Sequence, residues 1–230
     1  MKVSEKIIGV AAVVATIIIL LISSFEIAMY SDFSWYEKEY LKYEVLDDLE
    51  MEIDDVMRVT EEMMAYLRDD REDLVVETTV DGVEREFFND REKLHMVDVK
   101  GLFMGGLTLR RNSLILLAGA FIVLTIMKAN WKKLLPWSII WGIGGFLGLL
   151  LVGGALIASD FHRYFFLFHE IFFDNDLWLL DPRTDLMIRM LPEGFFFDMV
   201  VRIGVIFLIS LCVLLLTGVI IKSRKDKKDL

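Results

Sequence analysis

Four long runs without any Asp, Glu, Lys or Arg constrain this chain more than any other feature of its sequence. They comprise residues 7–25, 112–127, 134–159 and 203–221. A helix rises about 1.5 Å per residue and the hydrocarbon core of a bilayer is about 30 Å thick, so runs of this length predict membrane-spanning helices. We therefore expect an all-α integral membrane protein with four transmembrane helices, which excludes a single soluble globule.

The basic residues predict the orientation of these helices, because Lys and Arg of short loops stay on the cytoplasmic side. Three basic clusters fall on one side: Lys2 and Lys6; Lys128, Lys132 and Lys133; and Lys222, Arg224, Lys225, Lys227 and Lys228. We expect both termini in the cytoplasm and an acidic cap outside. Nucleic acid is excluded as a partner, because the net charge is −10 and no basic patch with interleaved aromatic residues occurs outside the membrane ends.

The predicted segments alternate membrane helices with outer regions. We expect transmembrane helix 1 over residues 7–29, an extracytoplasmic cap over 30–111, transmembrane helix 2 over 112–128, transmembrane helix 3 over 134–159, an aromatic interfacial segment over 160–199, transmembrane helix 4 over 200–221 and a cytoplasmic tail over 222–230. A cleaved signal peptide is the alternative for the first run, since a basic end precedes it. The length of that run and the lack of a small-x-small cleavage site before Phe25 favour an uncleaved helix.

The cap must fold without disulfide bonds, because the only cysteine, Cys212, lies within the fourth run. Residues 40–69 repeat apolar positions at helical spacing and predict one or two amphipathic helices. Leu74–Thr79 and Val83–Phe88 flank Asp81-Gly82, a pair suited to the positive φ values of a tight hairpin turn.

A capping box is predicted at Asn89, because Glu92 follows three residues later. The helix that begins there is expected to run to about Met104. The cap is therefore expected to be mostly helical with one small β-hairpin.

Three histidines are the candidates for proton transfer, because the unperturbed pKa of histidine is about 6.5. His95 has Asp98 three residues on, where a carboxylate on the same helix can hold one ring nitrogen; the alternative is a surface histidine in a solvated helix. His169 lies in residues 161–173, which hold seven aromatic residues, and the alternative there is an interfacial aromatic belt. His162 is expected to contact lipid headgroups, and the alternative is a third participant in the site.

Metal and thiol chemistry find little support in the sequence. A zinc site needs three or four converging ligands, and no H-E-x-x-H motif or cysteine pair is present. Asp174, Asn175 and Asp176 lack the glycine and the distal glutamate of a calcium loop, so they are expected to end the aromatic helix. A nucleophilic role for Cys212 is improbable, because this residue lies at mid-membrane depth.

The residues around the two outer histidine motifs resemble a known family. The motifs are Arg91-Glu92-x-x-His95-Met96-x-Asp98-Val99-Lys100-x-Leu102-Phe103, then Phe168-His169-x-x-Phe172-Phe173-x-Asn175-Asp176-x-Trp178-x-Leu180-Asp181-Pro182, then Leu191-Pro192-Glu193-x-Phe195-Phe196. With four membrane helices and a cap between the first two, this arrangement is similar to the bacterial lipoprotein intramolecular transacylase family, Lit.

The resemblance implies an acyltransferase of the bacterial cytoplasmic membrane that needs no metal or other cofactor. Its substrate would be a diacylated lipoprotein held in membrane lipid, whose sn-2 acyl chain moves to the α-amino group of the N-terminal cysteine. The resemblance assigns catalysis to His95 and His169. Beside them we expect orienting roles for Asp98, Glu92 and Arg91 and substrate contacts for Phe168, Phe172, Trp178 and Asn175; plain packing is the alternative for Phe172 and Trp178. A monomer is expected.

The chemistry implied by the resemblance requires proton transfer but no acyl-enzyme. Attack of the amine on the sn-2 ester closes an eight-membered ring, the ammonium must first lose a proton, and the departing alkoxide must gain one. One histidine can act as base and the other as acid or oxyanion donor, in either assignment. Two rivals stay open: another outer-leaflet lipid hydrolase or acyltransferase, which chelators would inhibit if it used a metal, and a non-catalytic protein whose acidic cap binds an exported partner.

Overall fold

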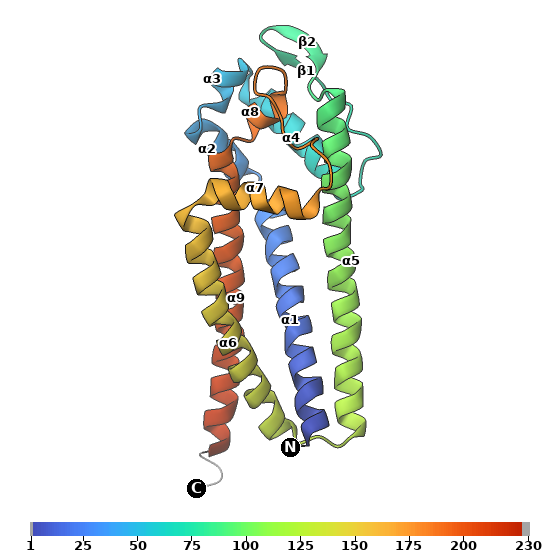
Figure 1. Cartoon of the computed structure of the whole chain (residues 1–230), viewed down its shortest axis with the longest axis vertical. Coiled ribbons are helices and arrows are strands. Elements are labelled where there is room, and N and C mark those ends of the chain that lie inside the picture. The colour runs from blue at the N-terminus through green and yellow to red at the C-terminus, as the bar shows by residue number, and fades with distance from the viewer. Residues whose placement is uncertain (1, 227–230) are drawn as a thin grey trace. The chain divides into compact units, whose positions relative to one another are not determined.

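The computed structural model of the protein describes residues 2–226 (Figure 1). Its elements in chain order are α1 (Val3–Tyr30), α2 (Ser34–Lys42), α3 (Val45–Leu49), α4 (Ile53–Leu67), β1 (Glu77–Val80), β2 (Val83–Glu86), α5 (Asp90–Ile126), α6 (Trp131–Ser159), α7 (Phe161–Phe172), α8 (Leu186–Met190) and α9 (Glu193–Asp226). The chain divides into two compact units. The membrane unit comprises Met1–Ile27, Leu107–Ser159 and Arg202–Leu230, and the polar unit comprises Ala28–Gly106 and Asp160–Val201.

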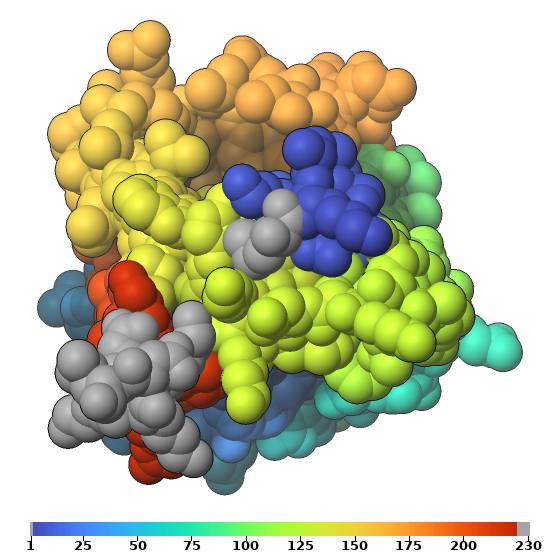
Figure 2. All heavy atoms as spheres, turned by 90° about the horizontal axis from the view of Figure 1, so that it is seen from below, coloured from blue at the N-terminus to red at the C-terminus, as the bar shows by residue number. Residues whose placement is uncertain are grey.

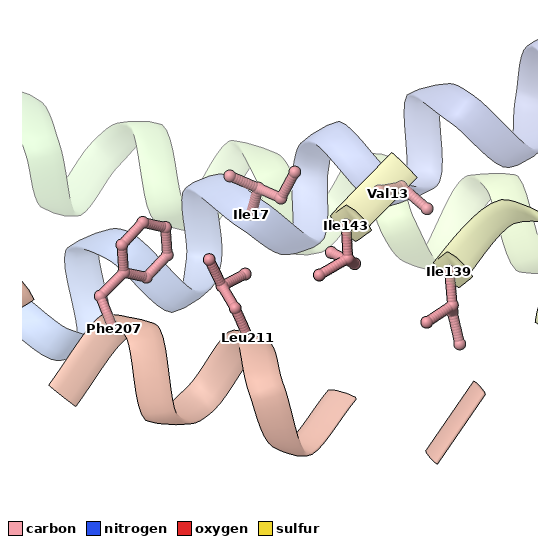
Figure 3. Packing of buried hydrophobic residues seen from close by; sticks show 6 residues of the cluster. All are labelled: Val13, Ile17, Ile139, Ile143, Phe207 and Leu211. Carbon is pink, nitrogen blue, oxygen red and sulfur yellow. The ribbon is translucent and has the colours of Figure 1, made fainter. Parts of the chain in front are cut away.

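The membrane unit confirms the expected integral membrane protein. Four helices, α1, α5, α6 and α9, are long and apolar enough to cross a bilayer. Three of them pack through buried aliphatic and aromatic side chains, which Figure 3 shows: Val13 and Ile17 of α1, Ile139 and Ile143 of α6, and Phe207 and Leu211 of α9. Gly142 lets α6 approach α1 closely, because a Cβ at this position would lie 2.6 Å from Val13 Cγ1.

The basic ends of the membrane helices gather on one face of the membrane unit. Figure 2 shows on this face the beginning of α1 (blue), the link between α5 and α6 (yellow-green) and the last described turns of α9 (red). The α5–α6 link turns through Lys128, whose φ is 55°. At the other end of α1, Glu26 forms an ion pair with Arg110 of α5. The described parts of the three basic clusters therefore share one end of the unit, while Lys227 and Lys228 lie outside the described residues.

The polar unit contains three short helices where the sequence predicts one or two. The helical pattern is interrupted because Glu44 and Glu50 adopt left-handed backbone conformations, with φ of 54° and 53°, on either side of α3. α2 and α4 are joined by a buried hydrogen bond of 2.6 Å between the hydroxyls of Tyr40 and Thr60. No disulfide contributes, since Cys212 is a free thiol.

The β-hairpin forms where the sequence predicts it. β1 and β2 pair antiparallel with Val80 opposite Val83. Both turn residues have positive φ, 52° at Asp81 and 70° at Gly82, as a two-residue type I′ turn requires. The strands are shorter than the predicted Leu74–Thr79 and Val83–Phe88, because pairing is confined to the four residues on each side of the turn.

The capping box at the start of α5 is confirmed in both directions. The backbone N–H of Asn89 donates to Glu92 Oε2 at 2.7 Å, and the backbone N–H of Glu92 donates to Asn89 Oδ1 at 3.0 Å. The predicted end near Met104 is wrong, because α5 continues to Ile126 as one helix of 37 residues. Such a helix is about 55 Å long, which is more than the hydrocarbon core needs. Its first part, residues 90–106, contains charged side chains and belongs to the polar unit.

The fourth membrane helix is likewise continuous with polar turns before it, and its predicted membrane bounds, residues 200–221, stay a prediction. α9 starts at Glu193, directly after Pro192, so that the first two turns belong to the polar unit. Gly194 is required in the first turn, because a Cβ there would lie 2.4 Å from the ring of Tyr43. Both long helices show the same cause: charged residues do not end a helix, and no proline separates the polar turns from the apolar ones.

Candidate active site

His169 lies near the end of α7 within the polar unit. α7 begins after Asp160, whose side chain accepts a hydrogen bond from the backbone N–H of Arg163, and it ends before Phe173, which is extended. Only 9% of His169 is exposed. Burial lowers the pKa of His169 below its usual range, because a dry environment disfavours the imidazolium ion. The ring is therefore neutral at neutral pH.

The hydrogen bonding of His169 determines which of its nitrogens carries the proton. Nδ1 lies 2.7 Å from the backbone carbonyl oxygen of Phe165, one turn earlier in α7. A carbonyl oxygen can only accept, so Nδ1 must be the donor, and Nε2 of the neutral ring keeps its lone pair. Nε2 of His169 is thus prepared to accept a proton.

His95 lies on the second turn of α5 and is even more buried, with 6% of its surface exposed. Burial is the main cause that lowers the pKa of His95 to about 4, and the charge of His169 adds to it. Among the described residues, Nδ1 of His95 is buried and has no hydrogen-bond partner. His95 is also neutral at neutral pH, with an unused nitrogen.

The fold brings these two histidines together from positions 74 residues apart in the sequence. The centres of the His95 and His169 rings are 6.2 Å apart. Phe173 contacts both, with its ring centre 5.3 Å from that of His95 and 5.6 Å from that of His169. The result is a pair of neutral imidazoles against an aromatic wall.

Trp178 completes the enclosure of His169. Its ring stacks on the imidazole at a centre-to-centre distance of 4.9 Å and an interplanar angle of 28°. The indole N–H donates to the carbonyl oxygen of Asn175 at 2.9 Å, which fixes the orientation of the ring. The segment that follows α7 therefore returns an aromatic side chain to the histidine.

The predicted hydrogen bond between Asp98 and His95 is wrong. Asp98 Oδ2 instead accepts a hydrogen bond of 2.9 Å from the side-chain amide of Asn175. The charge of Asp98 still raises the pKa of His95, but this effect is smaller than that of burial. Both side chains hold the segment after α7 against α5, and the predicted contact of Asn175 with substrate stays a prediction.

Glu92 fastens the first turn of α5 to the segment around α8. It is fully buried, and in addition to the backbone N–H of Asn89 it accepts that of Met187 at 2.6 Å. Burial raises the pKa of Glu92, although the two backbone hydrogen bonds oppose this. Asn89 supplies a second link through its side-chain amide, which donates to Asp185 at 2.8 Å.

Arg91 links α5 to the segment that carries Trp178. Its Nη2 donates to the backbone carbonyl of Asp176 and lies 3.6 Å from the carboxylate of the same residue. Nε of Arg91 is buried without a hydrogen-bond partner. Arg91, Glu92 and Asp98 thus lie near His95 on the first turns of α5. Their orienting roles stay predictions.

Phe168 and Phe172 lie on the open side of α7. Their rings are in contact at 4.7 Å, and they are 42% and 52% exposed. Phe168 also contacts the ring of His169 at 5.4 Å. This exposed apolar pair beside the histidine is available to hydrocarbon chains. The role of Phe168 and Phe172 as substrate contacts stays a prediction.

His162 belongs to a different environment at the beginning of α7. Its Nδ1 lies 2.7 Å from Glu193 Oε2, and its side chain is 66% exposed. The ring contacts Phe166 at 4.6 Å, and Phe166 in turn contacts Trp178 at 5.3 Å. His162 is therefore outside the buried pair.

Two residues of this site were missed by sequence reasoning. Phe173 touches both histidines, and the backbone carbonyl of Phe165 fixes the tautomer of His169. Phe165 and Phe173 lie four residues before and after His169, and this spacing was the available signal. Between residues 2 and 226, no group of three His, Cys, Asp or Glu side chains is arranged to hold a metal ion.

The membrane helices and the buried histidine pair define the class: an integral membrane protein with two buried, neighbouring histidines in its polar unit. Residues 10–196 match the family described as lipoprotein intramolecular transacylase Lit. Because this match covers most of the chain, the protein belongs to the Lit family of membrane acyltransferases.

Solved structures show the same fold. The chain is similar to the membrane-integral lipoprotein intramolecular transacylase Lit from Bacillus cereus, with a TM-score of 0.80, 19% identity, and coverage of 97% of this chain and 98% of that one. A structure of the Bacillus cereus protein with one histidine changed to arginine gives a TM-score of 0.73 at 21% identity, covering 98% of this chain and 95% of that one.

A curated relative extends the comparison to another organism. An uncharacterized protein of Aquifex aeolicus (strain VF5) is 31% identical over 139 residues, which are 59% of this chain and 58% of that protein. The matched part therefore spans little more than half the length of this relative.

Proposed function

We propose that this protein is a lipoprotein intramolecular transacylase that acts on diacylglyceryl-cysteine at the N-terminus of a lipoprotein. It moves the sn-2 acyl chain to the α-amino group of the same cysteine and leaves an N-acyl, S-monoacylglyceryl lyso-form lipoprotein. The observation that carries the proposal is the pair of neutral, buried histidines, His95 and His169, with ring centres 6.2 Å apart in a chain of the Lit family.

His169 is the base in this proposal. Its Nδ1–H is committed to the carbonyl of Phe165, so Nε2 faces the substrate with a free lone pair. The substrate amine, with an ordinary pKa of about 7.7–8.0, reaches the site as the free amine after losing a proton to solvent. As the amine attacks the ester carbonyl, Nε2 of His169 removes the second proton from its nitrogen.

In this proposal His95 stabilises the sn-2 oxygen, which is the leaving group. When the tetrahedral intermediate collapses, the bond between the carbonyl carbon and the sn-2 oxygen breaks, and the electron pair stays on that oxygen. The proton held by His169 ends on it, while an N–H of His95 steadies the developing alkoxide by a hydrogen bond. The reaction balances as one amide formed, one ester broken and one alcohol released, without a covalent enzyme intermediate.

The aromatic residues hold the two reacting groups of the substrate close together. Closing an eight-membered ring is entropically unfavourable for a flexible lipid, and holding both reacting groups in place removes much of this cost. Trp178 and Phe173 form the wall beside the histidines, and Phe168 and Phe172 offer an exposed apolar surface to the acyl chains. This arrangement supports a diacylated lipoprotein in membrane lipid as substrate.

We further propose that the polar unit is extracytoplasmic and that both termini are cytoplasmic, in the cytoplasmic membrane of a bacterium. The three basic clusters at one end of the membrane unit support this orientation. A single chain supplies both histidines, which supports a monomer as the active form. The acidic composition supports the absence of a nucleic-acid partner.

Co-expression with a reporter lipoprotein, in a bacterium that lacks other N-acylating activity, tests the proposal. The N-terminal lipopeptide of the reporter is fragmented by tandem mass spectrometry, because an internal transfer leaves the intact mass unchanged. We expect a blocked α-amine with an S-monoacylglyceryl fragment, lost in the His95→Ala and His169→Ala variants at equal expression. A free amine with both chains on glycerol would contradict the proposal.

A further inference from the structure

Two buried nitrogen atoms that have no hydrogen-bond partner among residues 2–226 lie on neighbouring turns of α5: Nε of Arg91 and Nδ1 of His95. An unpaired buried donor costs about 1–3 kcal/mol, and more when the group is charged. Native structures keep few such groups, and those they keep need a cause. A partner absent from the free protein is such a cause.

Arg91 and His95 face the same place. They are four residues apart in α5, so their side chains occupy one face of the helix. The charge of the Arg91 guanidinium contributes to the lowered pKa of His95, which places the charge within electrostatic reach of the imidazole. The unpaired Nε–H of Arg91 is therefore a donor beside the histidine pair.

Nη2 of the same guanidinium is already occupied. It donates to the carbonyl of Asp176 and lies 3.6 Å from its carboxylate, two residues before Trp178. This contact holds the guanidinium in place. A planar arginine can thus hold the segment through Nη2 while its Nε–H stays available as a preset donor.

Three other buried atoms without hydrogen bonds in the described part of the chain have different settings. Oε2 of Glu39 lies 3.5 Å from the ammonium of Lys42, and Oε1 of Glu86 is paired with Lys93. Oγ of Ser138 lies between membrane helices, where a Cβ at Gly9 would approach it to 2.5 Å. Arg91 and His95 are distinguished by their place in the candidate active site.

The proposed reaction develops negative charge at one oxygen to which neither histidine has been assigned as a donor, because His169 is the base and His95 serves the leaving oxygen. When the amine attacks the sn-2 ester, the carbon–nitrogen bond forms and the carbonyl π pair moves to oxygen, which becomes an oxyanion. Preset donors aimed at such an oxygen stabilise the intermediate more than the substrate, and a charged donor forms a stronger hydrogen bond than a neutral one. We infer that Nε–H of Arg91 donates to this oxyanion and that Arg91 is a catalytic residue of the transacylation.

This inference rests on the proposed function and is tested with purified protein and a synthetic diacylglyceryl-cysteine lipopeptide. We expect Arg91→Gln to lower kcat about 100-fold, the usual effect of removing an oxyanion donor, with KM changed less than about threefold. Arg91→Lys keeps the charge but loses the planar Nε–H, and we expect an intermediate loss of kcat. Thermal unfolding of each variant in detergent checks that it is folded.

A pair of inhibitors separates catalysis from a structural role. In the first, a phosphonate replaces the sn-2 ester carbonyl and mimics the tetrahedral oxyanion; in the second, an ether replaces the ester and mimics only the substrate. We expect Arg91→Gln to weaken the phosphonate by about the same factor as kcat/KM and to leave the ether unchanged. Arg189→Gln is the matched control, because Nε of Arg189 already donates to Asp48 at 2.9 Å.

Three results would overturn the inference, and they differ in what else they overturn. Unchanged kcat in Arg91→Gln, or equal weakening of the phosphonate and the ether, removes Arg91 from catalysis and leaves the transacylase proposal intact. An Arg91→Gln variant too unstable to assay leaves Arg91→Lys to decide by the same inhibitor ratio. A wild-type protein that does not N-acylate the lipopeptide overturns the proposed function together with this inference.

Discussion

The two ends of α7 carry histidines in opposite environments. His169, near the end of the helix, is 9% exposed, is hydrogen-bonded to a backbone carbonyl and lies against a second histidine. His162, at the beginning, has a side chain that is 66% exposed and pairs with the carboxylate of Glu193. The two rings are seven residues apart and therefore lie on nearly the same face of one helix.

This contrast bears on the catalytic role proposed for His169. Nδ1 of the exposed His162 is occupied by the carboxylate of Glu193, whereas burial favours the neutral form of His169 and keeps a nitrogen available. A neutral ring with a fixed tautomer is ready to exchange a proton. Variants of the residues around the two histidines test this distinction, with expected effects that decrease from the buried pair to Asp98.

The largest expected effect is the loss of activity without the buried pair. We expect His95→Ala and His169→Ala each to lower the rate of N-acylation by about 1000-fold, within the range for removal of a general acid or base. His162→Ala, the matched control from the same helix, is expected to retain the rate within about twofold. The rate is measured by tandem mass spectrometry of a lipopeptide with purified protein; an inactive His162→Ala would erase the distinction.

Acid is expected to destabilise the fold through His95. The pKa of His95 is about 4 in the folded protein, against about 6.5 when unfolded. Between these values the unfolded chain binds a proton that the folded chain does not, so stability falls as pH drops from about 6.5 to 4, by about 3 kcal/mol in total.

The His95→Gln variant provides the test of this pH dependence. Thermal unfolding in detergent at pH 7 and pH 4.5 should show a smaller drop of Tm for His95→Gln than for the wild type. His162→Gln should behave as the wild type does, because His162 is largely exposed. Equal drops in all three proteins would mean that His95 is not the group responsible.

The aromatic wall is expected to matter less than the histidines. Trp178→Leu removes the ring that stacks on His169 at 4.9 Å, and we expect about a tenfold loss of kcat/KM because the imidazole is less well held. Phe166 contacts Trp178 from the side of His162, so Phe166→Leu is the control and should cost about twofold or less. The same lipopeptide assay measures both, and a reversed order would place the substrate at the other end of α7.

Asp98→Asn should have the smallest effect, less than about threefold on kcat. Asp98 accepts a hydrogen bond from Asn175 and none from His95, so an orienting role like that of a triad aspartate is not expected. In triads, the corresponding change costs about 10⁴-fold in kcat. A loss of that size in the lipopeptide assay would restore the bond between Asp98 and His95 that the sequence predicted.

The elements that sequence analysis predicted well depend on local chemistry. The membrane helices follow from uncharged runs, the hairpin from Asp81-Gly82, and the start of α5 from the capping box of Asn89 and Glu92. The merging of the predicted cap helix with the second membrane helix was missed, because charge predicts where a helix leaves the membrane but not where it ends.

The site was only partly accessible from the sequence. Histidines are few, so His95 and His169 stood out, but their meeting depends on how the segment after α7 returns to α5. That packing depends on two hydrogen bonds, from Met187 to Glu92 and from Asn175 to Asp98. No local sequence pattern predicts either bond. The unpaired nitrogens of Arg91 and His95 are visible only once the packing around them is known.

The central claim is that the buried pair transfers an acyl chain within one lipopeptide by proton transfer alone. A crossover experiment tests it most directly: purified protein receives two diacylated lipopeptides, one with a deuterated sn-2 chain and one with a ¹⁵N-labelled peptide. We predict deuterated N-acyl chains only on unlabelled peptide. Deuterated chains on the ¹⁵N peptide would contradict the account, because they require release of the chain to the enzyme or to a second substrate molecule.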